Sequence, residues 1–170
     1  IIINIIKEPS AKTIDENIKT FNERVDYNKF DGDNEYNEYI ENLNTFQISN
    51  YEKHRELYNI IKDKDENSLY LIIEDDILIS NDYVNNIEEL INYLKDGNNE
   101  LWDILFLSLN TINSTDKIIN FRKVYDKLIT KCCYFIKPKI CEKLYNETNI
   151  FKLTMKNTLS KYIKDNENLN

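Results

Sequence analysis

The stretch of sequence that decides the fold is an apolar run that ends in three carboxylates, Leu69-Tyr70-Leu71-Ile72-Ile73-Glu74-Asp75-Asp76. A continuous apolar run of this length, preceded by the polar residues 63–67, predicts a central strand that helices bury on both faces. The three carboxylates then follow the carboxyl end of that strand. Ligands of layered α/β proteins bind beyond the carboxyl ends of the strands, so we expect a functional site there.

The rest of the chain alternates between strand and helix patterns. Apolar runs predict strands at residues 1–6, 25–30, 104–107 and 134–136. Apolar residues at helical spacing predict helices at residues 14–21, 51–62 and 84–94, and one that begins at Pro138. This alternation predicts an α/β fold, with a mostly parallel central sheet flanked by helices, in a single domain over residues 1–170.

Composition and charge exclude some classes of function. The formal net charge of −8 would repel a phosphate backbone, so we expect no nucleic-acid partner. No apolar run approaches the roughly 18 residues that span a bilayer, and the apolar residues 1–6 lack the charged leader of a signal peptide. We therefore expect a soluble domain with no membrane span. The sequence leaves its location open, and cytoplasmic and virus-associated sites are both compatible with it.

Cys132, Cys133 and Cys141 are the three cysteines of the chain. Three thiols cannot all pair, and their spacing is not that of a metal finger. We expect them to be small buried apolar residues.

The acidic triplet is the main candidate for chemistry. Three adjacent carboxylates repel one another, so they need either a compensating cation or full solvation. Glu74 and Asp76 can converge on one ion if the chain bends after the strand, and their hard oxygen ligands suit Mg²⁺ or Mn²⁺. Such an ion would offset the negative charge of a departing diphosphate. The alternative is an acidic turn exposed to water.

Several short blocks occur in the order and spacing of a known enzyme family. They are Ile3-Asn4, Asp31-Gly32, a helix with His54 and Tyr58, the run from Leu71 to Ile77, Trp102-Asp103 before a strand, and Tyr134-Phe135-Ile136 followed by Pro138. Together they make the chain resemble the family 25 glycosyltransferases, the group of lipooligosaccharide and collagen galactosyltransferases. The resemblance implies a GT-A-like nucleotide-sugar-binding fold, and we expect the family's C-terminal segment to be absent from this chain.

The resemblance also implies a reaction. It implies a metal-assisted, inverting transfer of a hexose, galactose or glucose, from a UDP-sugar to a hydroxyl of a glycan or glycosylated protein. Asp31, Asp75 and His54 would contact the donor, while His54 and Asp103 are the candidate catalytic residues. His54, the only histidine, suits acid–base work, but it can also simply pack on its helix. Asp103 can bind a ligand or make a structural hydrogen bond at the start of its strand.

Two departures from the family favour an alternative function. Lys156 stands near the position of an acidic residue in the family, and Lys53 stands where the family has Ser before its His. A carboxylate base at position 156 is therefore missing. The alternative is a GT-A-like module that has lost catalysis and binds a glycan or a protein partner.

Overall fold

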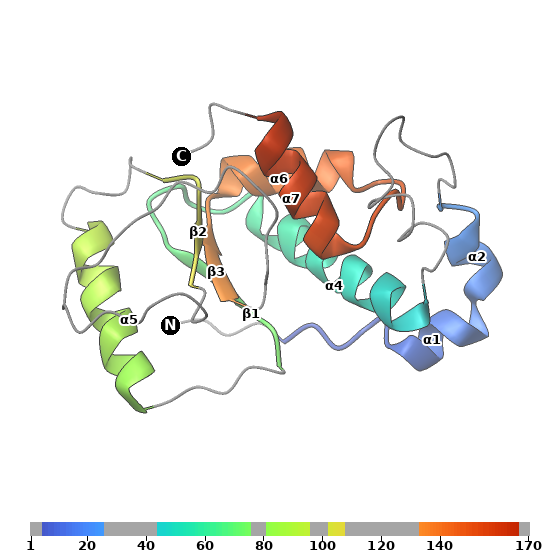
Figure 1. The fold of residues 1–170 in the computed structure, drawn as a ribbon, viewed down its shortest axis with the longest axis horizontal. Helices are drawn as coiled ribbons and strands as arrows, with labels where there is room; N and C mark the ends of the chain where they lie inside the picture. The colour runs from blue at the N-terminus through green and yellow to red at the C-terminus, as the bar shows by residue number, and fades with distance from the viewer. Residues whose placement is uncertain (1–4, 26–43, 76–80, 96–101, 108–132, 167–170) are drawn as a thin grey trace.

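A computed structural model describes residues 5–25, 44–75, 81–95, 102–107 and 133–166, and Figure 1 shows its arrangement. The helices are α1 (Ala11–Glu16), α2 (Ile18–Asn22), α4 (Thr45–Ile61), α5 (Asn81–Tyr93), α6 (Pro138–Glu147) and α7 (Met155–Asp165). The strands are β1 (Tyr70–Ile73), β2 (Ile104–Phe106) and β3 (Cys133–Ile136). The strands predicted at residues 1–6 and 25–30 lie largely outside the described residues. Residues 5 and 6 are not in a strand, and the Ile5 side chain is 73% exposed.

The three described strands form one sheet in the order β1-β3-β2. Both β1 and β2 pair with β3 in the antiparallel direction, so that Tyr70 and Ile104 both lie opposite Ile136. The expectation of a mostly parallel sheet is therefore wrong for the described strands. The physical reason is that an apolar run reports burial and not direction, because an antiparallel strand covered by helices on both faces needs the same side chains.

The centre of this sheet is β3 rather than the strand that carries the acidic triplet. All of β3 is buried, whereas Ile73 at the end of β1 is 45% exposed. Among the described strands, β1 lies at an edge of the sheet. Apolar character cannot separate a central strand from a half-covered edge strand, because both contribute large side chains to the core.

Helices cover both faces of the sheet, as the sequence predicts (Figure 1). Side chains alternate along β3, so Tyr134 and Ile136 join the cluster formed by helices α1, α4, α6 and α7. Phe135 faces the other way and packs with Leu90 of α5 and with Leu94, just after that helix. The sheet is thus the middle layer between α5 on one side and the larger group of helices on the other.

Helix α4 is the element that carries the candidate site residue His54. It begins earlier than the apolar spacing predicts, because Asn44 and Gln47 form a capping box at its start. Apart from Ser49, the buried residues of α4 recur every three or four positions and form one inward face: Ile48, Tyr51, His54, Tyr58 and Ile61. This face packs against α1, α6 and α7, so His54 points into the protein.

The helix predicted at residues 14–21 is divided into α1 and α2 at Asn17. Ser10 caps α1 by accepting a hydrogen bond from the Thr13 amide. Arg24, after α2, contacts Glu52 of α4 at 2.8 Å and lies over the ring of Phe151. These contacts hold the N-terminal helices against α4 and against Phe151, which precedes α7.

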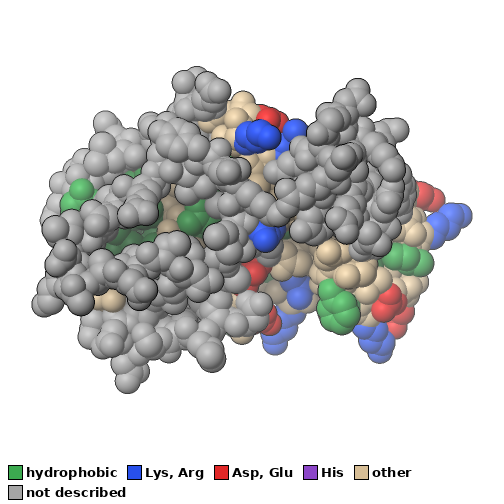
Figure 2. Space-filling model, in the orientation of Figure 1, with side chains coloured by type: hydrophobic (Ala, Val, Ile, Leu, Met, Phe, Trp, Pro, Cys, Tyr) green, Lys and Arg blue, Asp and Glu red, His purple; other side chains and the backbone are tan. Residues whose placement is uncertain are grey.

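The surface of the described residues carries mixed charge. On the face shown in Figure 2, basic and acidic side chains lie near one another over the described part. Within the described ranges, no helix is long and apolar enough to cross a membrane.

Candidate functional site

Glu74, the first residue after β1, meets His54 of α4. The His54 Nε2 atom lies 2.8 Å from Oε1 of Glu74, and their side chains are 3% and 13% exposed. Both residues are candidates from the sequence, where they stand 20 positions apart. The structure brings them together because the inward face of α4 packs beside the carboxyl end of β1.

A chain of buried polar groups continues from His54 into the protein. The Nδ1 atom of His54 lies 2.9 Å from the hydroxyl of Tyr134 on β3, which lies 2.9 Å from the hydroxyl of Tyr58 on α4. The Tyr58 hydroxyl also lies 3.6 Å from Sδ of Met155, the first residue of α7. One hydrogen-bonded chain therefore links elements from both halves of the sequence.

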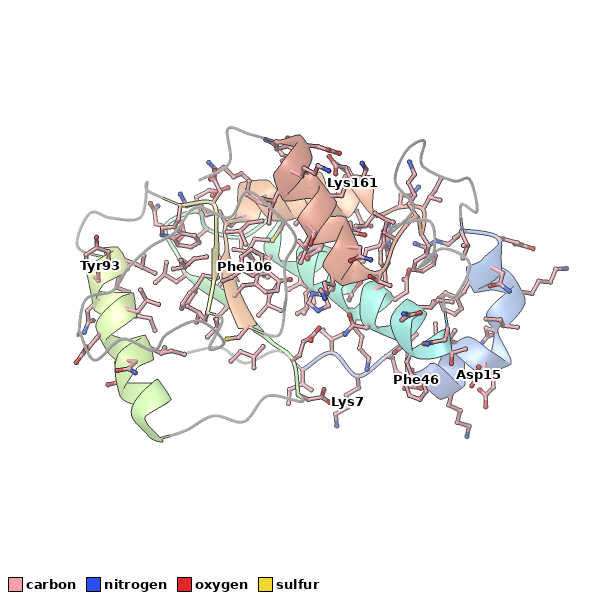
Figure 3. All side chains as sticks on the ribbon, in the orientation of Figure 1. Lys7, Asp15, Phe46, Tyr93, Phe106 and Lys161 are labelled. Atoms are coloured by element: carbon pink, nitrogen blue, oxygen red, sulfur yellow. The ribbon has the colours of Figure 1, made fainter. Side chains whose placement is uncertain are left out.

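Aromatic packing holds this chain in place. The rings of His54 and Tyr134 are nearly parallel, at 8°, with centroids 6.0 Å apart. Phe106 of β2, labelled in Figure 3, also packs against Tyr134, with ring centroids 5.4 Å apart. Because three strands and α4 surround it, Tyr134 has little freedom to turn away from His54.

Burial shifts the acidity of both tyrosines. Loss of hydration raises the pKa of Tyr58, and the hydrogen bond with Tyr134 offsets only part of that increase. Loss of hydration also raises the pKa of Tyr134 well above its ordinary value. Both phenols therefore stay protonated at neutral pH and remain hydrogen-bond donors.

Protein groups satisfy one carboxylate oxygen of Glu74. Its Oε1 atom receives the Nε2 contact of His54 at 2.8 Å and a hydrogen bond from Nδ2 of Asn50 at 3.0 Å. These two contacts use both lone pairs of that oxygen. The sequence predicts that a cation or water compensates the triplet, whereas an imidazole and an amide contact Oε1 of Glu74.

The predicted metal site is therefore only partly represented. Protein donors hold one oxygen of the Glu74 carboxylate, Oε1. Asp75 is an exposed carboxylate in the turn after β1 and has the oxygen chemistry that a hard cation requires. Asp76 lies outside the described residues, as does Asp31. Among the residues that are described, no group of three or more His, Cys, Asp or Glu side chains converges on a point.

Asp103 lies at the opposite edge of the sheet from Glu74. Its carbonyl accepts a hydrogen bond from the Lys137 amide, just beyond β3, and its carboxylate lies 2.7 Å from Nζ of Lys139. Glu74 follows the far end of β1, about four residues or roughly 13 Å away along the strands. The structure does not bring Asp103 together with His54 and Glu74, and its contacts match the structural alternative that the sequence leaves open.

Sequence reasoning missed two contributors to the site, Asn50 and Tyr134. Asn50 stands four residues before His54, so helical periodicity places both side chains on one face of α4. This signal was available in the sequence. Tyr134 lies within an apolar strand, and nothing in its local sequence distinguishes its hydroxyl from that of any other core tyrosine.

The fold and the site together define a class of site. It is a chain of hydrogen-bonded carboxylate, imidazole and phenol side chains that lies between the sheet and its helices. The chain reaches the surface where β1 ends. Comparisons of the chain with protein-family models, with characterised proteins and with solved structures gave no match.

Cys133 and Cys141 are buried, in agreement with their expected role as small core residues. Burial raises the pKa of the Cys141 thiol, which therefore stays protonated. Cys132 lies outside the described residues.

Proposed function

We propose that the chain is a UDP-sugar-dependent hexosyltransferase domain, of GT-A-like ancestry, whose donor site lies at the sheet edge where β1 ends. The observation that carries this proposal is the 2.8 Å contact between His54 and Glu74. These residues belong to two separate sequence blocks on which the resemblance to the family 25 glycosyltransferases depends. Their meeting at one point supports a common role for the two blocks.

The residues of this edge divide into internal and exposed groups. His54 is 2% exposed and contacts Glu74, so it positions that carboxylate rather than touching an acceptor. Glu74 in turn anchors the start of the acidic triplet, and Asp75 follows it into solvent. Asp75 and, from the sequence, Asp76 are the carboxylates that would hold Mn²⁺ or Mg²⁺ with a donor diphosphate.

The chemistry is a single displacement at the sugar. An acceptor hydroxyl attacks the anomeric carbon and gives up its proton to a base or to water, the bond from that carbon to the diphosphate breaks, and UDP leaves as the configuration inverts. A divalent ion held by Asp75 and Asp76 would supply positive charge to offset the negative charge of the departing diphosphate. The acceptor is a glycan or a glycosylated protein, in line with the resemblance.

A second candidate function is a binding module without turnover. The placement of Asp103 favours it, because this candidate base lies at the opposite edge and pairs with Lys139. Lys156 adds to this, since it follows Met155, which touches the hydroxyl chain, and it is not a carboxylate. A domain built in this way would bind a sugar nucleotide, a glycan or a protein partner and transfer sugar slowly.

Calorimetry with UDP-glucose and UDP-galactose, each with and without Mn²⁺, tests donor binding. We expect heat of binding only when nucleotide and metal are both present. The double change Asp75→Asn with Asp76→Asn should abolish it, whereas Asp63→Asn, an exposed aspartate in the turn before β1, should not. No binding of either UDP-sugar by the unaltered chain would refute the donor site.

Release of UDP in the presence of acceptors separates the two candidates. The transferase predicts UDP release that rises with a galactoside or hydroxylysine acceptor. Binding without such release would select the module, and Lys156→Asp would then be expected to increase transfer by about 10²–10⁴-fold if a missing base is the cause. Unchanged release by that variant would show that residue 156 is not the position of the base.

A further inference from the structure

The buried chain from Glu74 to Tyr58 restricts where its protons can lie. An ionised carboxylate only accepts hydrogen bonds, so the Nε2 atom of His54, at 2.8 Å, must carry a proton toward Glu74. Each tyrosine hydroxyl has a single proton to donate. The open question is therefore the direction of the two remaining bonds, between His54 and Tyr134 and between Tyr134 and Tyr58.

Two directions satisfy the distances. In the first, Tyr58 donates to Tyr134 and makes no hydrogen bond to Sδ of Met155, Tyr134 donates to Nδ1, and the ring of His54 is neutral. In the second, Nδ1 is protonated and donates to Tyr134, Tyr134 donates to Tyr58, and Tyr58 donates to Sδ of Met155 at 3.6 Å.

The first direction is favoured by the quality of its acceptors. Every bond in it ends on an oxygen or a ring nitrogen at 2.8–2.9 Å. The second direction ends on a thioether, which is a weak acceptor, and it also places a positive charge on a side chain that is 3% exposed, with Glu74 as its counter-charge.

We propose that Tyr134 and Tyr58 are positioning residues that hold His54 as its neutral Nε2–H tautomer, and so hold the Glu74 carboxylate as a fixed acceptor at the end of β1. Burial keeps both phenols protonated, as their raised pKa values indicate, so the donors that this arrangement needs are always present. The assignment of this tautomer depends only on the hydrogen-bonded chain. Its consequence for a sugar-nucleotide site rests on the proposed function.

The sequence offers a direct way to read this proton arrangement, because His54 is the only histidine. The full-length protein would be labelled with ¹⁵N at histidine, and the two ring nitrogens observed by NMR at neutral pH without ligand. We expect a protonated Nε2 and a bare Nδ1 that accepts a hydrogen bond. Protons on both nitrogens, or a proton on Nδ1 alone, would overturn the proposal.

Single hydroxyl deletions then assign the donor. Tyr134→Phe should shift the Nδ1 resonance, because it removes the bonded proton, and Tyr58→Phe should shift it less. Tyr51→Phe is the matched control, since Tyr51 is also a buried tyrosine of α4. Its hydroxyl donates to the Ile150 carbonyl and takes no part in the hydrogen-bonded chain that contains His54. An Nδ1 resonance that is unchanged in Tyr134→Phe would overturn the assignment.

If a variant does not fold, the spectrum of the unaltered protein still decides the tautomer. Nucleotide binding plays no part in these measurements. A protein with the expected tautomer that binds no UDP-sugar would refute the proposed function and leave the positioning role intact.

Discussion

His54 and Glu74 stabilise one another because each satisfies a polar atom of the other that is shielded from water. Their side chains are 3% and 13% exposed, and the atoms that meet are 2.8 Å apart. Removing one partner of such a pair leaves the other buried with fewer hydrogen bonds, and that loss costs more than the bond itself contributes. The pair should therefore be visible in the stability of the protein as well as in its function.

A double-mutant cycle measures this interaction. We expect His54→Ala and Glu74→Ala each to lower the free energy of unfolding by about 1–3 kcal/mol. The double variant should lose less than the two losses added together, with a coupling of about 0.5–3 kcal/mol. Urea unfolding gives all of these values, and Glu56→Ala, an exposed change on the same helix, is the control. If the losses of unfolding free energy in the two single variants simply added up in the double variant, the contact between His54 and Glu74 would be contradicted.

The buried tyrosines predict a pH dependence of stability. The folded-state pKa values of Tyr58 and Tyr134 are raised, so the folded protein holds these protons more tightly than the unfolded chain does. Their contribution is fully present below the ordinary tyrosine pKa of about 10 and is lost as the pH rises above it. Tyrosinate absorbance followed with circular dichroism should show exposed tyrosines ionising first and these two only as the protein unfolds.

Replacing one of these tyrosines checks the assignment. In Tyr58→Phe the fraction of tyrosine that ionises together with unfolding should fall. A chain in which all tyrosines ionise while the circular dichroism stays unchanged would contradict the burial of this pair.

At the scale of elements, α4 depends on its first turn as well as on its buried face. The Asn44 side chain accepts from the Gln47 amide at 3.0 Å, and the Gln47 side chain accepts from the Asn44 amide at 2.8 Å. These bonds satisfy amides that the helix itself leaves without partners. They also fix where α4 starts, and hence which residues face the sheet.

Removing this cap should lower stability in a way that a carboxylate can restore. We expect Asn44→Ala to lower the free energy of unfolding by about 0.5–2 kcal/mol. Asn44→Asp keeps an acceptor oxygen at the helix start and should stay close to the unaltered protein. Thermal melting compares the three proteins, and equal losses in the two variants would contradict the capping box.

The position of β3 in the sheet gives a second prediction at this scale. Ile136 on β3 is fully buried, whereas Ile73 on β1 is 45% exposed. We expect Ile136→Ala to cost about 2–5 kcal/mol of unfolding free energy, because it leaves a cavity in the core. Ile73→Ala should cost clearly less, and it is a matched control from the neighbouring strand. Similar losses would favour the buried central β1 that the sequence suggests.

At the scale of the whole molecule, sequence patterns identified the elements better than their arrangement. The apolar runs at β1, β2 and β3, the stripe of α5 and the proline that starts α6 are local signals, and the structure contains all of these elements. Strand direction and order depend on pairings between distant segments. Ile136 lies opposite both Tyr70 and Ile104, and no short stretch of sequence predicts these two pairings.

The candidate site was predictable to a similar degree. Glu74 follows an apolar strand and His54 is unique, so chemistry singles out both residues. Their contact was not predictable, because it depends on how α4 packs beside β1. Tyr134 joins the site only through β3, whose place between the other two strands comes from long-range pairing.

The place of β3 between β1 and β2 also has a consequence for how the chain folds. Among the described strands, β1 and β2 share no ladder, and each finds its partner only in residues 133–136. Contacts that close such long loops form slowly, because the chain loses conformational entropy before the strand pairing stabilises the folded state. During synthesis, the edges of β1 and β2 would stay unpaired with β3 until residues 133–136 are made. A chain that stops before residue 133 would therefore expose the edges of both strands, which chaperones can bind and which favour aggregation.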